Sequence, residues 1–202
     1  MQDLLTMLPN QARAFSTLEI IAVVTALLYL VLAIRENILC WPSALISTAI
    51  YVYLFFDARL YMESALNVFY FAIAIYGWHA WYVGRTDGQE LPVTLWPVRI
   101  HAVAISLVIG TSLANGYLLQ RYSDAVFPYI DSATTWAAIW ATYLVARKVL
   151  ENWWYWLAID TVLVFIYWSR DLQLTALLFV VYLVMIPFGL ISWTRSWRRA
   201  QA

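Results

Sequence analysis

The chain has little charge, little glycine or proline, and almost no cysteine or histidine. Charged residues make up 12% of its 202 residues and the formal net charge is zero, so no nucleic acid or other charged polymer is expected as a partner. The single cysteine, Cys40, excludes an internal disulfide and a cysteine metal site. Two histidines cannot build a histidine cluster, and neither a metal nor a cofactor is expected. Six glycines and six prolines argue against a loop-rich or disordered chain.

Hydrophobic residues are abundant instead, at 64%, with 12 tryptophans and 14 tyrosines. Such a composition is typical of a membrane protein with aromatic belts at the bilayer interfaces. A helix needs about 20 apolar residues to cross the hydrocarbon core. Apolar stretches predict seven spans, at residues 18–34, 38–56, 60–83, 100–119, 132–146, 153–168 and 172–193. We therefore predict an all-α integral membrane protein embedded in a lipid bilayer, without a cleavable signal peptide.

The positive charges predict how the chain is oriented in the membrane. Seven spans place the two termini on opposite sides. With the N-terminus outside, the inner segments hold Arg35, Arg85, Arg99, Arg147, Lys148, Arg195, Arg198 and Arg199, and the outer segments hold Arg13, Arg59, Arg121 and Arg170. The excess of basic residues on the inner side favours an N-terminus outside and a C-terminus inside.

An internal repeat is visible in the sequence. Two pairs of residues at the starts of the second and sixth spans match at an offset of 115: Asn37 with Asn152, and Trp41 with Trp156. Three pairs at the ends of the third and seventh spans match at an offset of 112: Tyr70 with Tyr182, Gly77 with Gly189, and Trp81 with Trp193. We predict one transporter domain over residues 1–202, with repeats at about 16–83 and 130–194 and a linker helix at about 99–120. Parallel repeats are a known transporter plan, with the site at the repeat interface near the midplane.

The first candidate site lies in the third span. Glu63, Asn67 and Tyr70 are four and three residues apart, so they share one helix face. Polar and ionisable side chains inside a span are costly and by default mark a substrate or ion path.

A second polar stripe opens the sixth span, with Trp153, Trp156 and Asp160 three and four residues apart. Asp160 would lie roughly 18 Å inside the membrane if the helix begins near Lys148, so its charge must meet water, a partner or a substrate. Flat aromatic faces suit planar or cationic ligands. Three alternatives stay open: Asp160 as a structural acceptor, the tryptophans as packing residues, and Glu151 as an interfacial residue.

These segments resemble the PnuC vitamin transporters, which are related to the SWEET sugar transporters. The third-helix pattern of the nicotinamide riboside carriers is Gln-x3-Asn-x2-Phe-x6-Gly-Trp-x2-Trp, and four residues match it: Asn67, Gly77, Trp78 and Trp81. Glu63 and Tyr70 replace its glutamine and phenylalanine. The sixth-helix pattern is Trp-Asn-x-Trp-x2-Trp-x3-Asp, and three residues match it: Trp153, Trp156 and Asp160. Leu150 and Glu151 replace its first two residues.

The resemblance implies seven helices in a three-plus-one-plus-three plan and assembly as a homotrimer. It also implies uptake of a B vitamin across a bacterial inner membrane, by facilitated diffusion with metabolic trapping, in support of NAD biosynthesis. Nicotinamide riboside is the first candidate substrate and thiamine the alternative; Glu63 argues against neutral riboflavin, and a SWEET-type sugar carrier is the remaining rival. No catalytic residues and no enzymatic activity are expected, because no phosphate-binding loop, nucleophile–base pair or metal cluster is present. The expected substrate-binding residues are Glu63, Asn67, Tyr70, Trp78, Glu151, Asn152, Trp153, Trp156 and Asp160.

Overall fold

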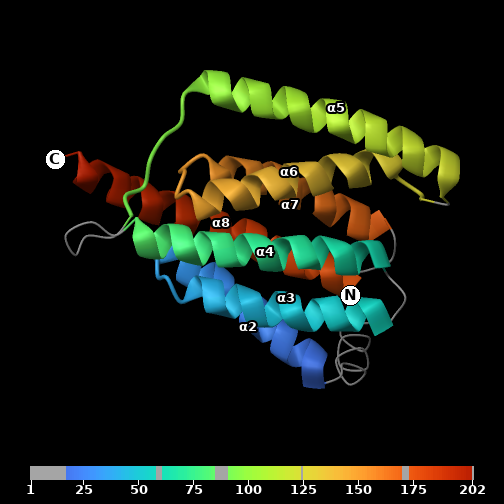
Figure 1. Ribbon diagram of the computed structural model, residues 1–202, viewed down its shortest axis with the longest axis horizontal. Helices are drawn as coiled ribbons and strands as arrows, with labels where there is room; N and C mark the ends of the chain where they lie inside the picture. The colour runs from blue at the N-terminus through green and yellow to red at the C-terminus, as the bar shows by residue number, and fades with distance from the viewer. Residues whose placement is uncertain (1–16, 58–60, 85–90, 124, 170–172, 202) are drawn as a thin grey trace, which may run out of the picture. The chain divides into compact units, whose positions relative to one another are not determined.

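The computed structural model describes residues 17–57, 61–84, 91–123, 125–169 and 173–201. Within them the chain forms helices and no strand beyond an isolated bridge (Figure 1). The seven helices are α2 (Thr17–Ile34), α3 (Cys40–Asp57), α4 (Tyr61–Val83), α5 (Val98–Tyr122), α6 (Pro128–Ala146), α7 (Asn152–Ser169) and α8 (Gln173–Ala200). Each predicted span corresponds to one of them, which confirms the all-α class and the helix order.

The helix ends differ most from the prediction at two places. Helix α6 begins at Pro128, which the sequence placed in a connector. Proline suits the first turn of a helix because its missing N–H would have no partner there and its φ is already helical. Helix α8 continues to Ala200, beyond the predicted end at residue 193, and contains Pro187. Its last turns carry Arg198 and Arg199 and are therefore more polar than the span itself.

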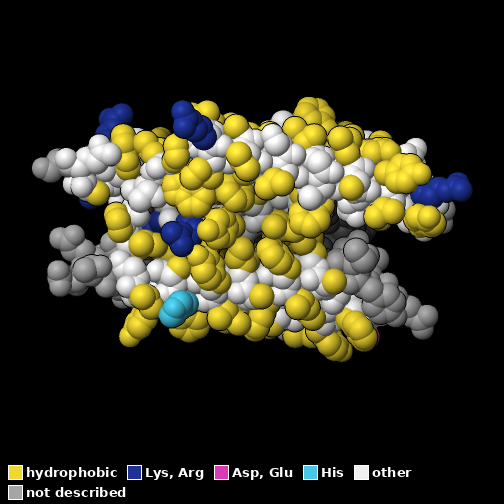
Figure 2. Space-filling view, turned by 45° about the horizontal axis from the view of Figure 1, so that its top comes forward, with side chains coloured by type: hydrophobic (Ala, Val, Ile, Leu, Met, Phe, Trp, Pro, Cys, Tyr) yellow, Lys and Arg dark blue, Asp and Glu magenta, His cyan; other side chains and the backbone are white. Residues whose placement is uncertain are grey.

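Four helices, α2, α3, α5 and α8, are long and apolar enough to cross a membrane by length and composition. The other three helices are α4, α6 and α7. They contain a larger share of polar side chains and of tryptophan and tyrosine side chains. Two of those three carry the predicted polar stripes. Hydrophobic side chains cover most of the face shown in Figure 2, and few Lys and Arg side chains interrupt them. This surface is what a bilayer requires of the helices that face it.

The chain divides into two compact units, Met1–Glu90 and Leu91–Ala202. In the first unit, α3 packs against both α2 and α4. In the second unit, α6 packs against α5 and α7, and α7 packs against α8. The linker helix α5 therefore belongs to the same unit as the second set of three helices.

The packing within the two units shows the register of the repeat. In the first unit the Trp41 ring lies over Gly77 and meets the Trp81 ring edge-on, at 5.4 Å between centroids and 88° between planes. In the second unit Trp153 takes that place: it lies over Gly189 and meets Trp193 at 5.5 Å and 87°.

These equivalent residues are all 112 positions apart. The predicted match of Asn37 and Trp41 with Asn152 and Trp156 is therefore wrong by three residues. The counterpart of Trp41 is Trp153, because the tryptophan that fills the space over the glycine defines the register.

The turns before α3 and α7 repeat the same geometry. Glu36 and Lys148, again 112 positions apart, have φ angles of 57° and 50°. The next N–H group turns back to the preceding helix: Asn37 donates to the Leu32 carbonyl and Val149 to the Leu144 carbonyl, each at 2.9 Å. This is the Schellman ending of a helix, in which glycine usually occupies the left-handed position.

We expect Glu36→Gly to preserve or raise thermal stability and Glu36→Val to lower it. A left-handed conformation costs a residue with a Cβ about 1–2 kcal/mol, most for β-branched side chains, whereas glycine adopts it freely. Melting temperatures of the two variants in the same detergent test this. Equal losses in both would mean that the Glu36 side chain, and not its backbone conformation, stabilises the turn.

Candidate functional site

Asp160 is a buried carboxylate within a membrane helix. It lies about two turns into α7 and is 3% exposed. An ionised carboxylate that is removed from water without a partner costs many kcal/mol. Asp160 therefore requires a proton, water or a bound ligand, and it is the strongest candidate for a functional group in the second unit.

Trp156 lies one turn before Asp160 on the same helix face. Its side chain is half-buried and packs beside Ala138 and Ala141 of α6, together with Ile159. The small alanine side chains leave room for the indole, which keeps part of its surface accessible. A half-exposed indole next to a carboxylate has the composition of a site for a planar or cationic ligand.

Trp153 and Asn152 are placed differently from Trp156. Trp153 is 2% exposed, and its ring is enclosed by Gly189 and Trp193 of α8. Asn152 is fully buried at the first residue of α7, where its Nδ2 donates to the Val149 carbonyl at 2.7 Å. Its Oδ1 has no hydrogen-bond partner among the described residues. Both residues join the start of α7 to its neighbours.

Glu151 precedes α7 and is 23% exposed. Its Oε1 accepts a hydrogen bond from the backbone N–H of Trp96 at 3.1 Å and lies 3.6 Å from Nε2 of His101. The sequence placed this residue either with the substrate or at the membrane interface. Its observed contacts are with the segment that leads into α5.

In the first unit the described candidates lie on α4. Asn67 and Tyr70 are half-buried, and Tyr70 meets Phe69 with 5.9 Å between ring centroids. Trp78 is 42% exposed, unlike its buried neighbour Gly77. The side chain of Glu63 lies outside the described residues.

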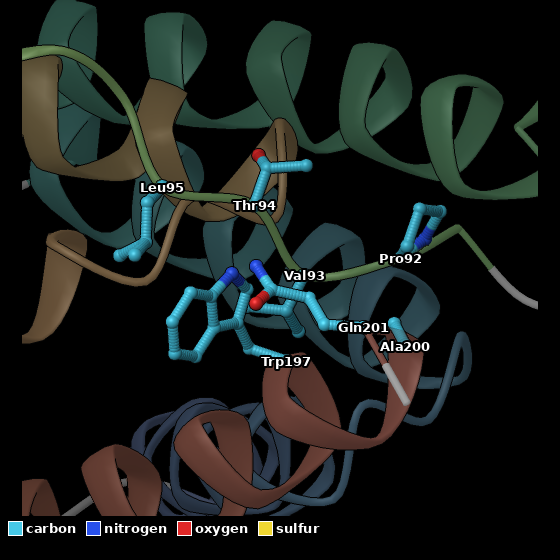
Figure 3. Close-up of a pocket in the computed structure, with 7 residues that line it drawn as sticks. All are labelled: Pro92, Val93, Thr94, Leu95, Trp197, Ala200 and Gln201. Carbon is cyan, nitrogen blue, oxygen red and sulfur yellow. The ribbon is translucent and has the colours of Figure 1, made fainter.

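One shallow cavity, of about 370 Å³, lies elsewhere in the second unit. None of the nine predicted site residues lines it. In Figure 3, Trp197 and Gln201 of the α8 end lie near the segment 91–97. The lining residues are Pro92, Val93, Thr94, Leu95, Trp197, Ala200 and Gln201. They are mostly apolar and contain no ionisable side chain, so this cavity is a poor site for a charged ligand.

The structure brings Trp156 and Asp160 together on one face of α7, and it keeps Asn67 and Tyr70 together on α4. Sequence reasoning missed His101, whose Nδ1 lies 3.0 Å from the Tyr155 hydroxyl. Glu151 and Tyr155, four residues apart, are the two residues that His101 meets, and their spacing was the feature of the sequence that could have indicated a shared partner. Among the described residues no group of three His, Cys, Asp or Glu side chains is arranged to hold a metal ion.

Comparison with known proteins identifies the family of this chain. Residues 16–195 match the family described as "Nicotinamide mononucleotide transporter". The chain belongs to this family. Its helical membrane architecture agrees with a family of transporters.

Two curated relatives and one solved structure are similar over most of their length. The nicotinamide riboside transporter PnuC of Escherichia coli is 26% identical, over 98% of this chain and 94% of its own. The riboflavin/roseoflavin transporter RibM of Streptomyces davaonensis is 24% identical, over 90% of this chain and 86% of its own. The crystal structure of a vitamin B3 transporter PnuC matches with a TM-score of 0.74 at 24% identity, over 97% of this chain and 90% of the other. This last likeness establishes the shared fold.

Proposed function

We propose that this chain is a carrier for nicotinamide riboside, which it moves across a bacterial cytoplasmic membrane by facilitated diffusion. The observation that carries the proposal is Asp160, a buried carboxylate one helical turn from the half-exposed Trp156. A pyridinium riboside supplies both a flat cationic ring for the indole and hydroxyl groups for a carboxylate. Metabolic trapping inside the cell would make the uptake directional.

The substrate-binding residues that we propose are those of the two polar stripes. In the second unit, Trp156 stacks the ring and Asp160 binds the cation or a hydroxyl group. In the first unit, Asn67 and Glu63 are the candidates for binding hydroxyl or carboxamide groups. Tyr70 and Trp78 are further candidates on α4. Trp153 and Asn152 support the start of α7, in keeping with their burial.

Thiamine is the second candidate substrate. It is also cationic, and Glu63 stands where the nicotinamide riboside pattern has a glutamine. The similarity to a riboflavin/roseoflavin transporter makes riboflavin a third substrate to be tested, although a neutral ligand does not need the carboxylates. The proposal also includes an N-terminus outside, a C-terminus inside, a single transporter domain and a homotrimer.

We expect cells or vesicles with the wild-type chain to take up labelled nicotinamide riboside, and unlabelled nicotinamide riboside to compete better than thiamine or riboflavin. Asp160→Asn should keep the melting temperature and lower uptake about tenfold or more, because the amide keeps the shape and loses the charge. Uptake equal to that of empty vesicles, from a well-folded wild-type protein, would rule out this substrate.

Glu63→Gln separates the two cationic vitamins. The variant restores the glutamine of the nicotinamide riboside pattern, so uptake of nicotinamide riboside should be nearly unchanged, since an amide still binds hydroxyl and carboxamide groups. If the wild-type substrate is thiamine and Glu63 contacts its charge, thiamine uptake should fall about tenfold or more, at about 1.4 kcal/mol per decade. Both uptakes are measured in both proteins. Unchanged transport in every case would remove Glu63 from the site.

A further inference from the structure

The segment 91–97 is fastened to the turn between α6 and α7. Thr94 lies beside Val149 in a parallel β-bridge. The Thr94 N–H donates to the Lys148 carbonyl at 3.0 Å, and the Leu150 N–H donates to the Thr94 carbonyl at 2.9 Å. These bonds use only backbone groups. They bring the residues that lead into α5 next to the start of α7.

Two side chains extend this connection. The carboxylate of Glu151 accepts the Trp96 N–H at 3.1 Å and lies 3.6 Å from Nε2 of His101. His101 is in the first turns of α5, and its Nδ1 lies 3.0 Å from the hydroxyl of Tyr155. Glu151 comes just before α7 and Tyr155 lies in its first turn, so the imidazole contacts two groups at the start of that helix.

The apolar surroundings of these contacts increase their contribution to the stability of the fold. His101 is 13% exposed, and its Nε2 and the Glu151 Oε2 are buried without a hydrogen-bond partner among the described residues. Trp96 also belongs to an aromatic cluster with Trp140 and Tyr143 of α6, in which ring centroids are 5.6–6.1 Å apart. Hydrogen bonds are stronger in such apolar surroundings, and a broken one is more costly.

We propose that Glu151 and His101 are positioning residues of the transport cycle, which hold the segment 91–97 and α5 to the helix that carries Trp156 and Asp160. This inference rests on the proposed function. Neither residue contacts the substrate: Oε1 of Glu151 is already occupied by Trp96 and faced by His101. Tyr155, which meets His101, lies about 100° from Trp156 around α7. The proposal therefore assigns Glu151 to this contact and not to the substrate.

The test compares transport with binding in Glu151→Ala, Glu151→Gln, His101→Ala and the double alanine variant. Initial rates of labelled nicotinamide riboside uptake into proteoliposomes give the maximal rate and KM, and calorimetry gives Kd. Because the pair acts on a conformational step, each single alanine variant should lower the maximal rate about fivefold or more, with KM and Kd within about twofold. Glu151→Gln should recover most of the rate, since its amide oxygen still accepts the Trp96 N–H. The double variant should be no slower than the slower single variant, as expected for one shared interaction.

The exposed His79 of α4 offers a matched control, and His79→Ala should transport like the wild type. A weaker Kd in Glu151→Gln, together with an unaffected His101→Ala, would return Glu151 to the substrate contacts and overturn the proposal. Rate losses that add up in the double variant would overturn the pairing.

If the wild-type protein takes up no nicotinamide riboside, the proposed function has failed, but the pairing can still be judged. Melting temperatures of the wild type, the two single alanine variants and the double alanine variant then form a double-mutant cycle. Non-additive losses in the double variant support the coupling of Glu151 with His101, and additive losses overturn it.

Discussion

Replacing Gly189 with alanine should destabilise the second unit severely, whereas the same change at Gly110 should be harmless. A Cβ at Gly189 would overlap the ring of Trp153, and that ring cannot move aside because Trp193 meets it edge-on at 5.5 Å. Overpacking of this kind typically costs about 1–3 kcal/mol and occasionally more. A Cβ at Gly110 meets no atom within 4 Å, and alanine is favoured over glycine in a helix by about 0.5–1 kcal/mol.

Yield of monodisperse protein and melting temperature in one detergent are the measurements. Gly77→Ala is the matched variant in the first unit, where the Cβ would overlap Trp41, and it should behave like Gly189→Ala. Normal stability of Gly189→Ala beside a destabilised Gly77→Ala would show that the two packing motifs are not equivalent. Normal stability of both would contradict the close approach of tryptophan and helix backbone in either unit.

The helices could be predicted from sequence because each span is a long apolar run, a signal that needs no tertiary information. The register of the repeat could not be predicted from the sequence. Asn-x3-Trp occurs at the start of both α3 and α7, and its offset of 115 looks as plausible as the true one. Only the packing of Trp153 over Gly189 decides that Trp41 corresponds to Trp153.

Some features of the candidate site could likewise be predicted from the sequence, and others could not. Asp160 could be recognised because a charge within an apolar helix is conspicuous. The contacts of Glu151 could not be predicted, because its hydrogen-bond partner is the backbone N–H of Trp96, 55 residues away. Every residue has such a donor except proline, so no sequence pattern marks the one that Glu151 uses.

With the register at 112, the two units can be compared residue by residue. The tryptophan over glycine and its edge-on tryptophan occur in both, as do the left-handed turns at Glu36 and Lys148. The candidate ligand residues on α7 differ from their counterparts on α3: Trp156 and Asp160 in the second unit correspond to Ala44 and Thr48 in the first. We propose that the shared tryptophan and glycine positions stabilise the two helix triplets, and that Trp156 and Asp160, which have no counterpart in the first unit, recognise the ligand. This comparison separates Trp153 from Trp156, although both belong to the same sequence pattern.

Trp156→Ala should therefore impair substrate binding in a well-folded protein, whereas Trp153→Ala should impair folding. Loss of a stacked aromatic face would weaken nicotinamide riboside binding by about 1–3 kcal/mol, a factor of about 5 to 150. Loss of the enclosed Trp153 ring would leave a large cavity and cost about 3–5 kcal/mol of stability. Calorimetry and thermal unfolding of both variants are the measurements.

Trp41→Ala supplies the control for Trp153→Ala, because Trp41 makes the equivalent contacts with Gly77 and Trp81 and should show a similar fall in melting temperature. A folded Trp153→Ala protein with weakened binding would restore Trp153 to the stacking role predicted from the sequence. Wild-type affinity in a folded Trp156→Ala protein would remove Trp156 from the site and leave Asp160 without its aromatic neighbour in the proposed mechanism.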